Sequence, residues 1–444
     1  MSGDEKCPIG FCSTSTQQGR YDQMEKVHES SSEGEVAKKK VVIVGAGMAG
    51  IAAARWLLDN DIHQRLDVVV LEARDRVGGR IHTNFEFNCP LDLGAAWLHN
   101  HCGENPISMI ASHLNLKIKK SDEESGEVYD LSGKQYGDLQ TMRTWELMED
   151  VLYKSVKSVQ GNFQEESLED VIFRKVSPKQ WSDPVFQSWF SILDFDLGTP
   201  ISQVSPAAIC QDWIRAMDED EEDADMVFTE TGYVGVINAL LTGRATDHPF
   251  LRPRIPNELL DSIPKSSHLK PLTILLNHCV EAITHSPMNC SPMVLIVRDP
   301  TDGSQQTIEA DRVLVTVPLG VLKSNAIQFS PPLSPQKQFA IQRAGFGNVV
   351  KIVLEFDKIF WSSQTEFLSI ADSSLCSPHP STPSSGMECQ PQLRGLCTHF
   401  WNQFPFNGKK ILVCFGLGDA ASIVDKVSSL NFELSFILSS FLAR

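Results

Sequence analysis

Residues 41–80 decide the fold of this chain and read VVIVGAGMAGIAAARWLLDNDIHQRLDVVVLEARDRVGGR. The β-branched run over residues 41–44 predicts a buried strand, and it leads directly into GAGMAG at residues 45–50, a G-x-G-x-x-G motif. An alanine-rich stretch then predicts a helix, and residues 67–71 predict a second strand that ends at Glu72. This order of elements, with an acid about 20 residues beyond the glycines, is the context that dinucleotide binding requires.

Each residue type in the motif has a physical reason. Gly45 permits the tight turn, Gly47 lets the backbone approach a pyrophosphate, and Gly50 lets the helix pack on the strand. The helix N-terminus adds unpaired N–H groups and the positive end of a dipole. Glu72 would accept hydrogen bonds from a ribose, and a carboxylate there disfavours a 2′-phosphate, so NADP is not expected. The alternative is an ordinary strand–turn–helix, because glycines also mark common turns.

Residues 72–80, EARDRVGGR, resemble the second signature of the flavin-containing amine oxidase family. In that family the ribose acid is followed by Gly-Gly-Arg, and the arginine reaches the FAD pyrophosphate. The resemblance implies that FAD is the cofactor and that Arg74, Gly79 and Arg80 bind it. The chemistry agrees, because two glycines allow a close backbone approach and a guanidinium forks onto phosphate. The alternative for Arg80 is a surface arginine that follows a turn.

Residues 94–99, GAAWLH, resemble the segment that lines the flavin in this family. The resemblance implies cofactor contacts from Gly94, Ala95, Ala96 and Trp97. It also makes His99 a catalytic candidate near the substrate, as in the polyamine-oxidising members. Asn100 departs from the family, where many members have glycine, and we expect it to alter the loop without removing the imidazole. The alternative for His99 is a histidine satisfied within the core.

Residues 345–356, GFGNVVKIVLEF, are the next match to the family, whose lysine at this point holds a water against flavin N5. The resemblance makes Lys351 the second catalytic candidate. In a strand, Lys351 shares a face with Val349 and Val353, because side chains alternate with a period of two. An amine on an apolar face is costly to bury, and its pKa falls when it is desolvated. The alternative is an amine that extends to the surface.

Other stretches give a coarse secondary structure. Residues 140–195 are mainly helical in pattern, and we expect an apolar core there from Trp145, Leu147, Met148, Val151 and Leu152. Residues 272–283, LTILLNHCVEAI, predict one strand. In it, Val280 matches a family position whose backbone meets the adenine. Residues 294–317 predict a hairpin and a further strand.

Length and pattern together predict two interleaved domains in an α/β fold. The chain has 444 residues, enough for a large core. We expect a Rossmann-like FAD-binding domain from residues 39–105 and 231–325. An α+β substrate-binding domain of the amine oxidase type takes residues 106–230 and 326–444. Residues 1–38 are polar and predict a disordered tail without a secretory signal.

The acidic composition limits the partners. The net charge of −17 arises from 39 basic and 56 acidic residues, a balance that repels nucleic acid and anionic membranes and attracts cations. The sequence contains no run of about 18 apolar residues, so it predicts no membrane span. The eleven cysteines are scattered, so we expect reduced thiols and no metal site. Reduced thiols favour a cytoplasmic location. A peroxisomal location remains an alternative if a C-terminal signal is missing. Residues 218–225, DEDEEDAD, are either a solvated loop or a patch that steers polycations.

The resemblance extends from about Lys39 to the last residue, whereas family members continue for tens of residues. We therefore expect a truncated sequence or a natural short form, without a Gly-Glu segment and a helix that normally complete the flavin site. Three functions remain open. The first is a polyamine oxidase that acts on spermine, spermidine or their acetylated forms by hydride transfer to flavin N5, with O2 reduced to H2O2. The others are another flavin amine oxidase, including the histone-lysine demethylase type, and an inactive fragment. The oligomeric state is left open.

Overall fold

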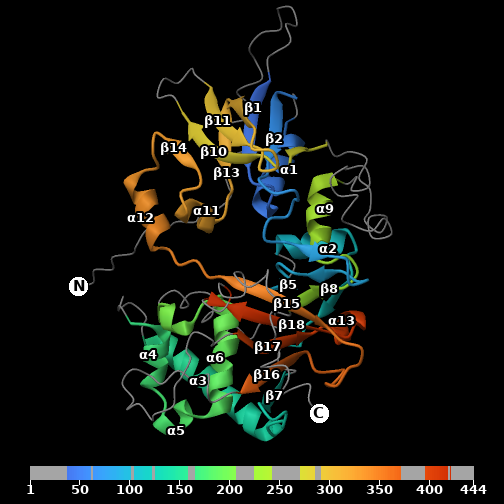
Figure 1. Cartoon of the computed structure of the whole chain (residues 1–444), viewed down its shortest axis with the longest axis vertical. Coiled ribbons are helices and arrows are strands. Elements are labelled where there is room, and N and C mark those ends of the chain that lie inside the picture. Colours follow the sequence, from blue (N-terminus) through green and yellow to red (C-terminus); the bar gives the residue numbers. More distant parts are fainter. Residues whose placement is uncertain are drawn as a thin grey trace, which may run out of the picture.

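The structure is a computed structural model that describes residues 38–61, 64–101, 105–122, 126–158, 166–206, 225–242, 271–285, 292–371, 396–418 and 421. Its elements form two groups along the long axis (Figure 1). One group surrounds β1 (Lys39–Val44) and β2 (Leu66–Leu71). The other surrounds β15 (Val349–Glu355) and β18 (Ile411–Leu417).

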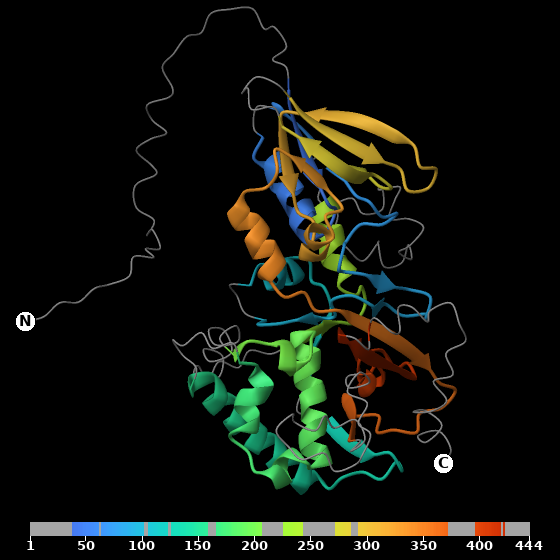
Figure 2. The same ribbon diagram turned by 60° about the vertical axis from the view of Figure 1, so that its left-hand side comes forward.

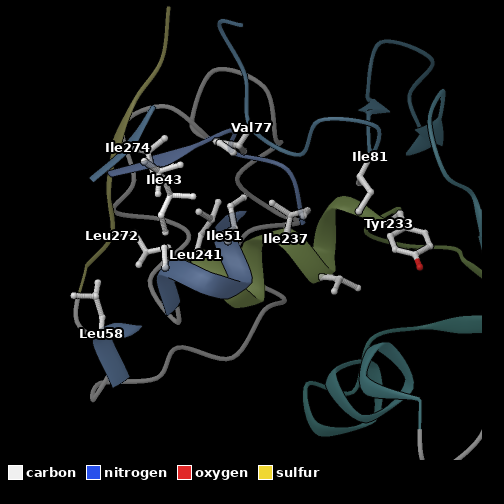
Figure 3. Close-up of a cluster of buried hydrophobic side chains, with 14 of the residues drawn as sticks. Ile43, Ile51, Leu58, Val77, Ile81, Tyr233, Ile237, Leu241, Leu272 and Ile274 are labelled. Carbon is white, nitrogen blue, oxygen red and sulfur yellow. The ribbon is translucent and has the colours of Figure 1, made fainter. Parts of the chain in front are cut away.

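The first sheet is parallel throughout and has the strand order β13-β1-β2-β9, with β13 at Arg312–Val315 and β9 at Thr273–Leu275. Alternate residues of β1 face opposite sides, so that Ile43 packs with α1 (Met48–Asp59) and α9 (Val234–Thr242), as Figure 3 shows. Val42 faces the second sheet. Burial on both faces explains why residues 41–44 of β1 and 68–71 of β2 are all apolar.

The second sheet lies over the first and has the order β12-β11-β10-β14. Its strands are β10 (Cys279–Thr284), β11 (Met293–Arg298), β12 (Gln305–Ala310) and β14 (Gln328–Ser330). Helices α11 (Leu319–Lys323) and α12 (Pro335–Arg343) follow, and residues 344–348 then connect α12 to β15 in the other group (Figure 2).

The third sheet has the order β15-β18-β17-β16-β7. Its remaining strands are β7 (Gly126–Asp130), β16 (Phe367–Ala371) and β17 (Leu396–Asn402), with α13 (Phe404–Asn407) before β18. A helical layer packs beside it, formed by α3 (Asp138–Ser158), α4 (Leu168–Phe173), α5 (Pro178–Trp181), α6 (Pro184–Leu197) and the 3-10 helix η2 (Ile201–Gln203). The core predicted in this layer is confirmed, because Met148, Val151 and Leu152 are buried.

Short elements lie between the two groups. They are β3 (Thr83–Asn84) paired with β4 (Leu91–Asp92), the sheet of β5 (Trp97–Leu98), β8 (Met226–Phe228) and β6 (Ile118–Lys120), and α2 (Pro106–His113). Within the described ranges, every helix is too short or too polar to cross a membrane.

The prediction of one strand over residues 272–283 is wrong. The structure splits the stretch into β9 and β10, which belong to different sheets. Asn277 causes the break, because it takes the left-handed conformation (φ 57°) and its N–H bonds to Arg74 O at 3.0 Å. The helices, the hairpin of β11 and β12, and β13 match the prediction. The domain boundaries stay a prediction, and residues 1–37 of the expected tail and residues 218–224 of the acidic run lie outside the described residues.

Candidate active site

Of the three glycines in the motif at residues 45–50, Gly47 is the one with open space where a side chain would lie. A Cβ at Gly50 would lie 1.9 Å from Gly45 O, and Gly45 itself has a φ of 108°, so the chain needs glycine at both positions. Gly47 differs, because its φ of −78° suits any residue and a Cβ there would meet its nearest neighbour, Gly79 Cα, at 4.0 Å. Neither conformation nor protein packing demands glycine at Gly47. The vacant direction therefore fits a pyrophosphate at the start of α1.

A second glycine pair lies against this loop. Gly78 N donates to Ala46 O at 2.8 Å, and a Cβ at Gly79, where φ is 59°, would lie 3.2 Å from Gly47 Cα. Arg80 follows directly, and its guanidinium is exposed with no partner among the described residues. The predicted phosphate-binding residues are thus together, and Arg80 is available to an anion.

Glu72 is buried at the end of β2 and links the same segments. Its Oε2 accepts from Ala46 N at 2.7 Å and its Oε1 from Arg74 N at 3.0 Å. Each carboxylate oxygen has a further lone pair that a ribose hydroxyl could use. The Arg74 side chain is exposed, and Val280 is buried on β10 in the cluster that also contains Leu71.

Lys351 lies on β15 and joins it to the predicted flavin-lining segment. Its Nζ donates to Gly94 O at 2.6 Å and to Asp92 O at 3.0 Å. The ammonium also lies over the rings of Trp97, Trp401 and Phe415, at 5.4 to 5.8 Å from their centroids. Desolvation lowers the pKa of Lys351 to about 8, against the attraction of the Asp92 carboxylate. The amine therefore does not extend to the surface, which removes the alternative stated above.

Asp92 is a residue of this site that sequence reasoning missed. Its side chain is buried, and residue exposure is 5%. The carboxylate accepts from Thr83 Oγ1 and, at 3.0 to 3.1 Å, from Tyr233 N just before α9. Burial raises its pKa to about 6, while these hydrogen bonds and the charge of Lys351 act in the opposite direction. The only signal in the sequence was an acid within an otherwise apolar stretch, PLDLGAAWL.

An aromatic wall surrounds the amine. Trp97 packs on Trp401 with ring centroids 4.3 Å apart, and Phe195 on Phe415 at the same distance. His399 stacks on the ring of Phe367 at 5.1 Å, and burial lowers its pKa to about 4, so the imidazole is neutral. Such a wall excludes water from the neighbourhood of Lys351 and strengthens its electrostatic interactions.

The rest of the lining segment also has defined places. Gly94 must be glycine, because a Cβ would lie 2.0 Å from Arg80 O. Ala95 is exposed and Ala96 is buried, so only the former is open to a ligand in the described structure. Asn100 takes a φ of 52°, the left-handed region that favours glycine and, next, asparagine. This explains how the loop accommodates its departure from the family.

His99 is exposed, with 67% of its side-chain surface accessible, so it is not a core histidine. Its Nδ1 lies 2.5 Å from Asp225 Oδ2, the last acid of the run at 218–225. Asp196 on α6 interacts with both groups. Desolvation and the charge of Asp225 raise the pKa of Asp196 to about 7, against the attraction of His99. The histidine therefore stands among acids that can attract a cation. Among the described residues, no group of three His, Cys, Asp or Glu side chains could hold a metal.

Comparison with known proteins gives a consistent set of relatives. A family model for flavin containing amine oxidoreductase matches residues 48–430. Polyamine oxidase 4 of Oryza sativa subsp. japonica is 30% identical over 407 residues, covering 87% of this chain and 69% of the rice protein. Polyamine oxidase 2 of Arabidopsis thaliana is 29% identical over 405 residues, with the same coverage of 87% and 69%. Lysine-specific histone demethylase 2 of Homo sapiens is 30% identical over 344 residues, covering 74% of this chain and 36% of that protein.

A solved structure of putrescine oxidase, redesigned in its cofactor binding, covers 92% of this chain and 80% of its own. The TM-score is 0.58 at 19% identity, so the likeness concerns the fold. The predicted α/β fold of the amine oxidase type is confirmed.

Proposed function

We propose that this chain, which belongs to the flavin-containing amine oxidoreductase family, oxidises polyamines such as spermine, spermidine or their acetylated forms. The family makes it an FAD-dependent amine oxidase. The observation that carries the proposal is Lys351, held by two carbonyls of the lining segment beside an aromatic wall. Two relatives named polyamine oxidases, at 29–30% identity, support the substrate class.

The glycine-rich segments and the predicted flavin-lining segment fit FAD. Residues 45–50 and the start of α1 would hold its pyrophosphate with Arg80, Glu72 its ribose, and the backbone near Val280 its adenine. Gly94, Ala95 and Trp97 would line the flavin ring, whereas Ala96 is buried. Bound FAD would supply the redox chemistry, a two-electron oxidation of the carbon next to the amine with O2 as the final acceptor to give H2O2.

The side chains of the chain itself hold charge and exclude water. Lys351 presents an ammonium whose third hydrogen is not used by the two carbonyls, and it can hold a water or transfer a proton. Its pKa of about 8 brings that proton into the working range of an oxidase near neutral pH. His99 and Asp225 would attract the cationic arms of a polyamine at the exposed side of the site.

Peroxide release from a substrate panel tests the proposal. The purified full chain with FAD is given spermine, spermidine, their N-acetylated forms, putrescine and a methylated-lysine peptide. We expect the highest kcat/KM among the polyamines. Turnover of the methylated peptide alone would favour the demethylase type instead, and no peroxide with any amine would reject the proposed activity.

A further inference from the structure

Lys351 carries its charge in the interior without a direct ion pair. Among the described residues, its ammonium donates to the main-chain oxygens of Asp92 and Gly94, and no carboxylate lies within ion-pair distance. Carbonyl dipoles and ring faces favour a cation, yet burial acts against the charged form. The groups that face the amine from other elements therefore decide its protonation.

The carboxylate of Asp92 is held by two donors, Thr83 and Tyr233, and Thr83 is itself held by a third residue. Thr83 donates its hydroxyl to Oδ1, Tyr233 donates its backbone N–H to both oxygens, and Val234 N in turn donates to Thr83 Oγ1 at 3.2 Å. The turn before α9 depends on Gly232, where φ is 64° and a Cβ would lie 3.0 Å from Asp92 Oδ1. One residue thus contacts Lys351 through its main chain and presents a buried negative charge through its side chain.

We propose that Asp92 is a positioning residue whose buried carboxylate is the counter-charge that keeps Lys351 protonated, while its carbonyl sets the place of the ammonium. This proposal rests on the proposed function, because Lys351 carries that function and Asp92 is assigned here as the partner of Lys351. Asp92 acts through Lys351 and needs no contact with the substrate.

Within the described part of the chain, Asp92 is the charged group that acts on the amine, and the other elements around it contribute rings. Strands β5, β17 and β18 contribute the rings of Trp97, Trp401 and Phe415. His399 on β17 is neutral at pH 7, and burial together with Asp92 raises the pKa of the Tyr233 phenol, which stays protonated. Asp92 is the carboxylate whose attraction opposes desolvation at Lys351. Between about pH 6 and pH 8 both members of the pair are charged.

The test measures the pKa of Lys351 directly by NMR on the full chain labelled with ¹³C at lysine Cε, without substrate, with Lys351→Arg to assign the resonance. Asp92→Asn keeps oxygen and nitrogen in place of the two carboxylate oxygens, so an acceptor remains for Tyr233 N. We expect it to lower the pKa of Lys351 by about one unit or more. The matched control Asp225→Asn removes the same charge beside His99 and should leave the pKa of Lys351 unchanged. No shift in Asp92→Asn, or an equal shift in both variants, would overturn the proposal.

Two further measurements keep the proposal testable if Asp92→Asn does not fold. In the wild-type chain the Lys351 resonance should show a second inflection near pH 6, where Asp92 titrates. Thr83→Val removes the donor to that carboxylate and should move the inflection to higher pH. A single inflection in both proteins would reject the counter-charge. Because the titration needs no turnover, a failure of the proposed oxidation would leave its outcome intact.

Discussion

The phosphate side of the site is built from main chain, whereas the amine side is built from side chains. Around residues 45–50 and 78–79 the important atoms are N–H groups and the space left by absent Cβ atoms. Around Lys351 they are two buried charges and a set of aromatic rings. The comparison teaches that substitutions on the first side act by occupying space, and those on the second by changing charge.

The largest expected effect is at the phosphate side. Gly47→Val should abolish FAD retention while the protein stays folded, because the new side chain fills the space of the pyrophosphate and meets little protein. Flavin absorbance after gel filtration and circular dichroism measure the two outcomes. Gly50→Ala is the matched control and should disrupt the fold as well, since its Cβ collides with Gly45 O at 1.9 Å. Stoichiometric flavin in Gly47→Val would contradict the prediction.

At the amine side, Lys351→Met keeps a similar stem and removes the charge. We expect FAD to bind and flavin reduction or reoxidation to slow by ~10²-fold or more, the scale of a lost positioned proton donor or electrostatic group. Stopped-flow absorbance measures both half-reactions. Unchanged rates in both half-reactions would show that Lys351 has only a structural role. The amine side would then no longer differ from the phosphate side in depending on charge.

Within the aromatic wall, we expect replacement of His399 to change the stability of the fold rather than the rate of the reaction. His399 has a folded pKa of about 4, depressed from 6.5, so its contribution is present above pH 6.5 and is lost as the pH falls through 4. Replacing it with Asn should reduce the acid-induced loss of unfolding free energy between pH 6.5 and 4 by roughly 2–3 kcal/mol. Urea unfolding at several pH values measures this. Parallel pH profiles for the variant and the wild type would mean that burial does not lower the pKa of His399 in the folded protein.

The smallest effect is expected at Asp196 and Asp225, the two acids near His99. Asp225→Asn together with Asp196→Asn should lower kcat/KM for spermine by roughly three- to tenfold at low salt, and the deficit should shrink as salt rises. N-acetylated spermine, with one charge fewer, is the matched substrate and should lose less. A deficit that does not depend on ionic strength would show that Asp196 and Asp225 do not steer the substrate, and would leave the run at 218–225 with the alternative of a solvated loop.

The two sides also differ in what the sequence could predict. The phosphate side follows from consecutive residues, because glycines, a strand and an acid within residues 41–80 carry the whole arrangement. The resemblance to a family located Lys351, but its partners depend on tertiary contacts across long separations. Asp92 meets Lys351 across 259 positions and Tyr233 across 141, which no local pattern encodes. The aromatic wall likewise joins β5, α6, β17 and β18.

The buried carboxylate of Asp92, bonded to the backbone just before α9, has a consequence for evolution and engineering. Its folded pKa of about 6 lies above the ordinary value of 3.8, so the stability it contributes is complete below about pH 4 and is lost as the pH rises through 6. At neutral pH the ionised carboxylate therefore costs folding stability, and a neutral residue that still accepts from Tyr233 N, such as asparagine, is the more stable choice. A library selected for heat resistance alone should drift away from aspartate here, whereas selection for turnover should restore it.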